Sequence, residues 1–193
     1  MSTTIVLHGG KTSIESSQTD QFFSLFTSLP QTKRVKAILV YWARDRNTWD
    51  KVFGRDREKI LRTKNKEIDF ILPESPKDLF KSIGDCDIVY VAGGEAYNIE
   101  PLYEQLSNLK SAVEGKIYLG SSMGAFLASE SYVLSADAQD TNSVHKGLGL
   151  VKVNCLAHWN VEPKKEQKLK LLQQSSRLPI LTLGEGEYST FVI

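Results

Sequence analysis

The sequence predicts an α/β fold in which a doubly wound, mostly parallel sheet carries helices on both faces. Short apolar or β-branched runs alternate with longer amphipathic runs along the 193 residues. Alternation of this kind is typical of right-handed βαβ units. The chain has no internal repeat, low-complexity stretch or linker, so we expect a single domain over residues 1–193.

The strand signals are short runs that are apolar or rich in β-branched residues. Those expected in the main sheet are Thr4–His8, Val35–Tyr41, Ile68–Leu72, Ile88–Ala92, Lys116–Gly120 and Leu178–Leu183. A final apolar strand is expected at Tyr188–Ile193. Tyr132–Val133 and Val151–Leu156 are candidates for an antiparallel ribbon beside the sheet.

Helical patterns lie between these runs. They are Thr19–Ser28, Thr48–Arg62, Pro76–Ile83, Ile99–Leu109 and Glu162–Gln174. Ligands of such sheets bind outside the carboxyl ends of the strands. The turns at 8–11, 92–95 and 121–123 are therefore expected on one rim, where the chemistry would lie.

One motif points to a reaction. Residues Gly120–Ala125 read Gly-Ser-Ser-Met-Gly-Ala, a Gly-x-Ser-x-Gly element centred on Ser122, between a strand-like and a helix-like run. Small residues permit a sharp turn that exposes the hydroxyl, and the new helix directs free N–H groups to the same point. A plain turn can have the same pentapeptide, so the motif is a hypothesis that needs partners.

A serine nucleophile needs a base, and the base needs a group that orients it. The histidines of the chain are His8, His145 and His158. His8 ends the first strand and His158 ends an apolar run, whereas His145 lies in a polar stretch typical of a surface loop. The acids between Ser122 and His158 are Glu130, Asp137 and Asp140. The last two lie in one turn, and spacing does not choose between them.

Four blocks, spread over nearly the whole chain, share a further pattern. They are Ile5–Gly10, Ile88–Tyr97, Gly120–Ala125 and Gly147–His158, with a Glu-Gly turn at Leu183–Gly186. Together they resemble peptidase E, the aspartyl dipeptidase family of serine peptidases. The resemblance implies a flavodoxin-like sheet, a Ser-His-Asp triad and hydrolysis of short peptides through an acyl-enzyme.

Carried over residue by residue, the resemblance implies roles for five positions. Ser122 would be the nucleophile, His158 the general base and Asp137, 15 positions after the serine, the orienting carboxylate. The backbone N–H groups of Gly94 and Met123 would form the oxyanion hole. Ala92, Ala96 and Ala157 also depart from the family pattern, as Met123 does, without removing these groups.

Glu95 is the strongest departure, because the family commonly has Asn or Asp there. We expect a carboxylate beside the nucleophile to repel an acidic substrate side chain and to pair with a substrate amine. The alternative is that Glu95 faces solvent and favours the start of the next helix.

Two other functions compete with this interpretation. The α/β-hydrolase fold has the same motif, and His8–Gly10 superficially fits its oxyanion segment, but it inserts further strands and helices between serine and histidine, which here are only 36 positions apart. The other alternative is a catalytically disarmed small-ligand binding or scaffold protein of the same fold. Covalent labelling of Ser122 by a fluorophosphonate would separate it from an enzyme.

Composition argues against several classes of partner. The formal net charge is +1, and the basic residues between positions 43 and 67 are interspersed with acids, so neither nucleic acid nor an anionic membrane is expected. No dinucleotide, phosphate-loop or metal-ligand pattern is present, so we expect no cofactor and no metal. Cys86 and Cys155 are far apart, and no leader peptide or spanning segment is visible. These features predict a cytoplasmic enzyme, a monomer or homodimer.

Overall fold

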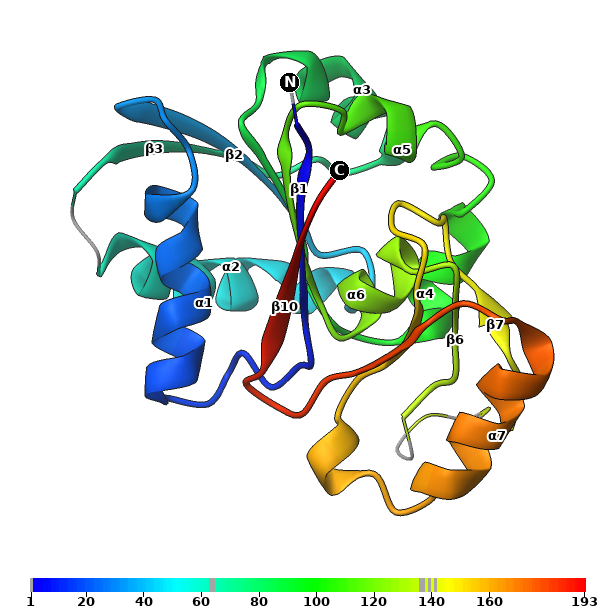
Figure 1. The fold of residues 1–193 in the computed structure, drawn as a ribbon. Helices are drawn as coiled ribbons and strands as arrows, with labels where there is room; N and C mark the ends of the chain where they lie inside the picture. The colour runs from blue at the N-terminus through cyan, green and yellow to red at the C-terminus, as the bar shows by residue number, and fades with distance from the viewer. Residues whose placement is uncertain (1, 63–64, 136–137, 139, 141) are drawn as a thin grey trace.

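The computed structural model describes residues 2–62, 65–135, 138, 140 and 142–193. Its main sheet has six strands in the order β10-β1-β5-β4-β2-β3 (Figure 1). The strands are β1 Thr4–His8, β2 Arg34–Val40, β3 Glu67–Ile71, β4 Ile88–Val91, β5 Ile117–Ser121 and β10 Tyr188–Val192. All pair in parallel except β10, which is antiparallel to β1.

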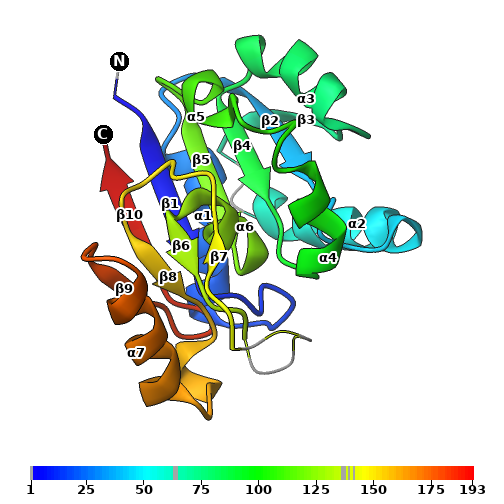
Figure 2. The ribbon, with the colours of Figure 1, turned by 90° about the vertical axis from the view of Figure 1, so that its right-hand side faces the viewer.

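The helices cover both faces of this sheet. They are α1 Ser17–Ser28, α2 Trp49–Leu61, α3 Pro76–Ser82, α4 Ala96–Ile99, α5 Leu109–Ala112 and α6 Met123–Ala128, whereas α7 Lys165–Ser175 packs against the strand Ile180–Thr182 of a smaller second sheet. Figure 2 shows α6 in front of the sheet and α1 behind it. The α/β class predicted from the alternation is therefore confirmed. The strand order differs from the 2-1-3-4-5 order of flavodoxin, since β1 lies between β5 and β10.

Helix α1 illustrates how local sequence builds the core. The Ser16 hydroxyl caps the helix by accepting a hydrogen bond of 3.1 Å from the N–H of Thr19. Phe22, Phe23 and Phe26 lie on the face of α1 that points into the core, and all three are fully buried. Their rings pack around Tyr90 of β4, with ring centroids 5.7 to 6.3 Å apart.

The prediction of one helix over Ile99–Leu109 is wrong. The α-helix α4 ends at Ile99, and a 3₁₀ turn, Glu100–Leu102, follows it. Pro101 lies in the first positions of that turn. Proline has no N–H for the ladder and its ring clashes with the preceding turn, so an α-helix does not continue through it.

A second, four-stranded sheet has the order β7-β6-β8-β9. Its strands are β6 Ser131–Tyr132, β7 His145–Lys146, β8 Asn154–Leu156 and β9 Ile180–Thr182. The expected antiparallel ribbon is wrong, because β6 pairs in parallel with β8 and its antiparallel partner is β7. The run 178–183 also forms its strand here, beside β8, because β10 occupies the main-sheet edge next to β1. His145 lies in β7 and not in a loop.

The carboxyl ends of β1, β4 and β5 meet at one rim of the main sheet. Leu7 and Val91 both pair with Gly120, so the turns that follow the three strands are neighbours. Gly124 lets α6 approach this rim closely, since a Cβ there would lie 2.0 Å from the carbonyl oxygen of Val91. No helix within the described ranges has the length and apolar character needed to cross a membrane.

Candidate active site

Ser122 occupies the sharp turn between β5 and α6. Its backbone has φ 50° and ψ −106°, a conformation that is strained for a residue with a side chain. Its N–H donates to the carbonyl oxygen of His8, 2.9 Å away, which ties the turn to the end of β1. The strand, turn and helix context predicted for the Gly-x-Ser-x-Gly motif is therefore present.

His158 follows β8 and faces this serine. Its Nε2 lies 2.9 Å from the Ser122 Oγ, although the two residues are 36 positions apart. The residue is in the left-handed region, with φ 57°, and its N–H donates to the carbonyl oxygen of Gly9 over 3.0 Å. The serine and histidine selected from the sequence thus come together at hydrogen-bond distance.

Glu185 lies on the other side of the imidazole. Its Oε1 is 3.0 Å from the Nδ1 of His158, and the two side chains are only 16% and 18% exposed, respectively. The Glu185 N–H donates to the Oδ1 of Asn160 over 2.7 Å, which fixes the turn that carries it. The Glu-Gly turn is visible in the sequence, but no role was predicted for Glu185 there. The available signal was an acid between two glycines, directly before the strand that pairs with β1.

The structure describes only one of the two aspartates considered for the orienting role. Asp137 lies outside the described residues. Asp140 has a half-exposed side chain, and its Oδ2 is 3.8 Å from the Nε2 of His145. The Nδ1 of His145 lies 2.8 Å from the Oε1 of Glu100. Within the described residues, His145 belongs to a separate cluster, and Glu185 is the carboxylate in contact with His158.

Gly94 and Met123 line a small cavity together with Ser122. Met123 is the first residue of α6, so its N–H has no acceptor inside the helix. Neither N–H donates to another group within the described part of the chain. Free donors next to a serine hydroxyl are the groups that an oxyanion hole requires.

Two cavities adjoin the Ser122–His158 pair and share Gly94 and Glu95. The larger, the polar cavity, measures about 280 Å³ and is lined by Lys11, Thr12, Ser13, Arg44, Gly93, Gly94, Glu95, Ser121, Ser122 and His158. The smaller cavity measures about 50 Å³ and is lined by Gly94, Glu95, Ala96, Ser122, Met123, Phe126, Leu134, Ser135, Ala138 and His158.

Charged groups of both signs line the polar cavity. Arg44 follows β2, and its Nε is buried without a hydrogen-bond partner among the described residues. Lys11 follows β1 and has φ 63°. Glu95 is exposed, and its side chain makes no capping hydrogen bond with α4. The hydrogen bond by which the Glu95 side chain would cap α4 is therefore not made.

His8 lies just behind the site, at the carboxyl end of β1. Its side chain is fully buried, and its Nδ1 accepts the N–H of Gly10 over 3.0 Å. Burial and, to a smaller extent, the nearby charge of His158 together lower the pKa of His8 from 6.5 to about 4. His8 is therefore neutral near pH 7.

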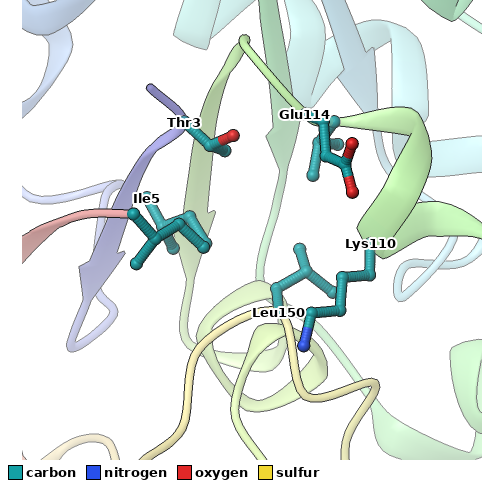
Figure 3. Close-up of a pocket in the computed structure, with 7 residues that line it drawn as sticks. Thr3, Ile5, Lys110, Glu114 and Leu150 are labelled. Carbon is teal, nitrogen blue, oxygen red and sulfur yellow. The ribbon is translucent and has the colours of Figure 1, made fainter. Parts of the chain in front are cut away.

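A further cavity of about 310 Å³ lies at the opposite end of the sheet (Figure 3). Ile5, Leu150 and Val113 form its apolar walls, and Lys110 and Glu114 lie at its side. Its lining contains no serine, cysteine or histidine. This cavity therefore has no nucleophile–base pair to compete with the rim of the sheet.

Metal and thiol chemistry have little basis in the described residues. There, no group of three or more His, Cys, Asp or Glu side chains is arranged to hold a metal ion. Cys86 and Cys155 are both free and buried, and burial raises the pKa of their thiols to about 11 and about 12. A thiol with so high a pKa is a poor nucleophile near neutral pH.

Comparison with known proteins assigns the family. The sequence profile of Peptidase family S51 matches residues 5–191. No curated protein sequence matches the chain at a significant level.

Two solved structures share the fold. A peptidase from an acI-B1 Actinobacterium has a TM-score of 0.67 and 15% identity, covering 99% of this chain and 87% of that one. A proposed peptidase E protein from Listeria monocytogenes EGD-e has a TM-score of 0.62 and 15% identity, covering 100% and 98%. With the family match and the rim geometry, the chain belongs to Peptidase family S51 and is a serine peptidase of the peptidase E type.

Proposed function

We propose that this peptidase hydrolyses short peptides, as a dipeptidase does, through an acyl-enzyme on Ser122, with His158 as base and Glu185 as the orienting carboxylate. One observation carries the proposal: two hydrogen bonds in series, from Ser122 Oγ to His158 Nε2 at 2.9 Å and from His158 Nδ1 to Glu185 Oε1 at 3.0 Å. This is the geometry of nucleophile, base and orienting group.

In the first half-reaction, Ser122 Oγ attacks the scissile carbonyl carbon while His158 Nε2 takes the hydroxyl proton. Glu185 keeps the other ring proton on Nδ1 and stabilises the imidazolium that forms. The free N–H groups of Gly94 and Met123 stabilise the negative charge on the carbonyl oxygen by hydrogen bonding to it. His158 then gives its proton to the leaving amine, the C–N bond breaks, and an ester on Ser122 remains.

In the second half-reaction, water replaces the leaving peptide. His158 Nε2 takes a proton from the water, the hydroxyl oxygen attacks the ester carbon, and the same N–H pair stabilises the second oxyanion. Return of the proton to Ser122 Oγ releases the acid product. Both halves use one base and one pair of donors, and neither needs a metal or an organic cofactor.

The polar cavity supports a substrate with charges of both signs. Arg44 has a buried Nε without a partner in the described structure, and a substrate carboxylate would supply one. Glu95 lines the same cavity and would pair with a substrate ammonium group. A dipeptide has one free carboxylate and one free amine within a few bonds of its single peptide bond. We therefore infer dipeptide-like substrates whose amine is recognised by Glu95.

The test combines labelling with turnover. Ser122→Ala should abolish both fluorophosphonate labelling and hydrolysis of a panel of Asp-X, Glu-X, Asn-X, Lys-X and neutral dipeptides. Ser111→Ala, an exposed serine on α5, is the matched control and should retain both. Activity in the Ser122→Ala protein would place the nucleophile elsewhere.

The same experiment addresses the disarmed alternative. A binding or scaffold protein of this fold would show neither labelling of Ser122 nor turnover in the unmodified chain. Labelling without turnover on the panel would keep the nucleophile and reject short peptides as substrates.

Location and assembly belong to the same proposal. Two free, buried thiols suit a reducing compartment, so we propose a cytoplasmic enzyme. A net charge of +1 gives it no electrostatic reason to bind nucleic acid or an anionic membrane. It is proposed to act as a monomer or homodimer.

A further inference from the structure

The short segment His8–Gly10 bonds to the backbone of all three parts of the active site. The carbonyl oxygen of His8 accepts the N–H of Ser122 at 2.9 Å, and that of Gly9 accepts the N–H of His158 at 3.0 Å. The turn that carries Glu185 is bonded directly after that residue: the Gly186 N–H donates to the Gly10 carbonyl oxygen over 3.3 Å, and the Gly9 N–H donates to the Glu187 carbonyl oxygen over 2.9 Å. The conformation of this segment therefore affects all three groups.

The His8 imidazole fixes the end of the segment. Its Nδ1 lies 3.0 Å from the backbone nitrogen of Gly10. A backbone N–H can only donate, so this Nδ1 must be the unprotonated acceptor and the ring proton must be on Nε2. The Ser121 Oγ, 3.3 Å from the same Nδ1, can act only as a second donor.

A buried imidazole at this position lowers the stability of the fold. His8 is 0% exposed and packs against Phe22, with the two rings tilted by 37° and their centroids 4.3 Å apart, and its Nε2 has no hydrogen-bond partner among the described residues. A buried polar group without a partner destabilises a fold, and an apolar side chain would avoid that penalty. The hydrogen bond to Gly10 is what an apolar side chain could not supply.

Gly10 in turn forms the wall against which His158 packs. Its φ is 105°, and a Cβ at this position would lie only 2.3 Å from the Cε1 of His158. The imidazole is thus in direct contact with the Gly10 backbone. A small rotation of this peptide would move the ring and change the 2.9 Å contact between Nε2 and Ser122 Oγ.

We propose that His8 is a positioning residue for the reaction: its neutral Nδ1 holds the Gly10 N–H, and the Gly10 backbone holds the His158 ring in line with Ser122. The inference rests on the proposed Ser122–His158 chemistry and adds a residue that does not touch the substrate. The low pKa of His8 is consistent with it, because the acceptor stays unprotonated at the pH where the enzyme would work.

The test compares two replacements of different chemistry. His8→Leu keeps an apolar volume but removes the acceptor, and should lower kcat and the rate of Ser122 labelling about 100-fold, the scale expected for a misplaced catalytic group. KM should stay within about threefold, since His8 does not line the polar cavity and Arg44 and Glu95 keep their places in it. His8→Asn can present its Oδ1 to the Gly10 N–H and should recover kcat to within about tenfold of the unmodified protein.

Phe22→Leu is the matched packing control. It removes the ring packed against His8 while the acceptor remains, so it should lower thermal stability and leave kcat within a few-fold. Equal kcat losses in Phe22→Leu and His8→Leu would overturn the proposal, because packing alone would then explain them. Wild-type kcat in a folded His8→Leu protein would also overturn it.

Nitrogen-15 NMR of the unmodified protein keeps the proposal testable if His8→Leu does not fold. His8 should be the Nε2–H tautomer, with an unprotonated Nδ1 that accepts a hydrogen bond. The opposite tautomer would overturn the proposal. Failure of the underlying chemistry is distinguishable, because it would appear as activity retained by Ser122→Ala, whatever the state of His8.

Discussion

His158 Nδ1 and Glu185 Oε1 lie 3.0 Å apart, although the two residues are 27 positions apart in the sequence. His158 follows β8, and Glu185 follows β9, the parallel neighbour of β8 in the second sheet, and precedes β10 of the main sheet. The contact therefore forms just beyond the carboxyl ends of two paired strands, and it ties the base to the segment that leads into β10.

The first prediction concerns the orienting carboxylate. Glu185→Gln removes the negative charge that stabilises the imidazolium, so we expect kcat/KM to fall on the order of 10⁴-fold, as when the aspartate of a Ser-His-Asp enzyme becomes asparagine. Asp137→Asn and Asp140→Asn are the controls and should each cost less than about tenfold. Steady-state kinetics on one dipeptide decides the matter. A large loss in Asp137→Asn with a small one in Glu185→Gln would return the role to Asp137.

The second prediction concerns Gly10. Gly10→Ala places a Cβ about where the His158 ring lies and strains a residue with φ 105°. We expect kcat to fall at least about 100-fold and the melting temperature to fall as well. Gly54→Ala is the matched control: a Cβ there meets nothing within 4 Å, and alanine stabilises a helix interior by about 1 kcal/mol relative to glycine. Unchanged kcat in Gly10→Ala would show that the His158 ring has room to move aside.

The third prediction concerns Arg44. If its guanidinium binds the substrate carboxylate, Arg44→Gln should raise KM for a dipeptide about 10-fold to 100-fold, the loss of one charge-assisted pair. The same substrate with an amidated C-terminus should show little difference between the two proteins. Arg46→Gln, an exposed neighbour paired with Glu74, should behave as the unmodified enzyme. Equal effects on acid and amide substrates would mean that Arg44 binds no terminal carboxylate.

The fourth prediction concerns Glu95. Its carboxylate lines the polar cavity without capping α4, so Glu95→Asn should raise kcat/KM for Asp-X dipeptides and lower it for substrates recognised by a free amine. Rates on Asp-X, Lys-X and N-acetylated peptides give the comparison, and Glu104→Gln, another exposed acid, is the control. An unmodified enzyme that already prefers Asp-X, or a variant with unchanged preference, would show that Glu95 does not select the substrate.

The fifth prediction is a loss of stability in acid that depends on His8. Its pKa is 6.5 in a model peptide and about 4 in the fold. Between these values the unfolded chain binds the proton and the folded chain does not, so the free energy of unfolding falls as the pH falls from about 6.5 to about 4. The loss attributable to His8 is about 3 kcal/mol.

Urea unfolding at several pH values measures this loss. The curve for His8→Asn should be flatter over the same window, because asparagine does not titrate. Parallel curves for the two proteins would contradict the burial-driven pKa of His8.

Much of the main sheet was predictable because local signals and tertiary structure agree there. The five runs that became parallel strands are rich in apolar or β-branched residues, and the Gly-x-Ser-x-Gly turn is fixed by residues adjacent in the sequence. The helix predicted over 99–109 failed because Pro101 ends the α-helical ladder within an otherwise periodic pattern. The run 178–183 was recognised as a strand, but its partner was not, since composition does not say which sheet edge is free.

The sequence by itself determined the α/β class, the serine at the rim and the histidine selected as its base, because each depends on short-range patterns or a family resemblance. Only the tertiary structure brought Glu185 to His158, Arg44 to the polar cavity and His8 beneath Gly10. Those contacts join residues 27 or more positions apart, or depend on which of several polar atoms faces inward. Spacing along a chain cannot supply such information, because it arises when separate strands and turns pack against one another.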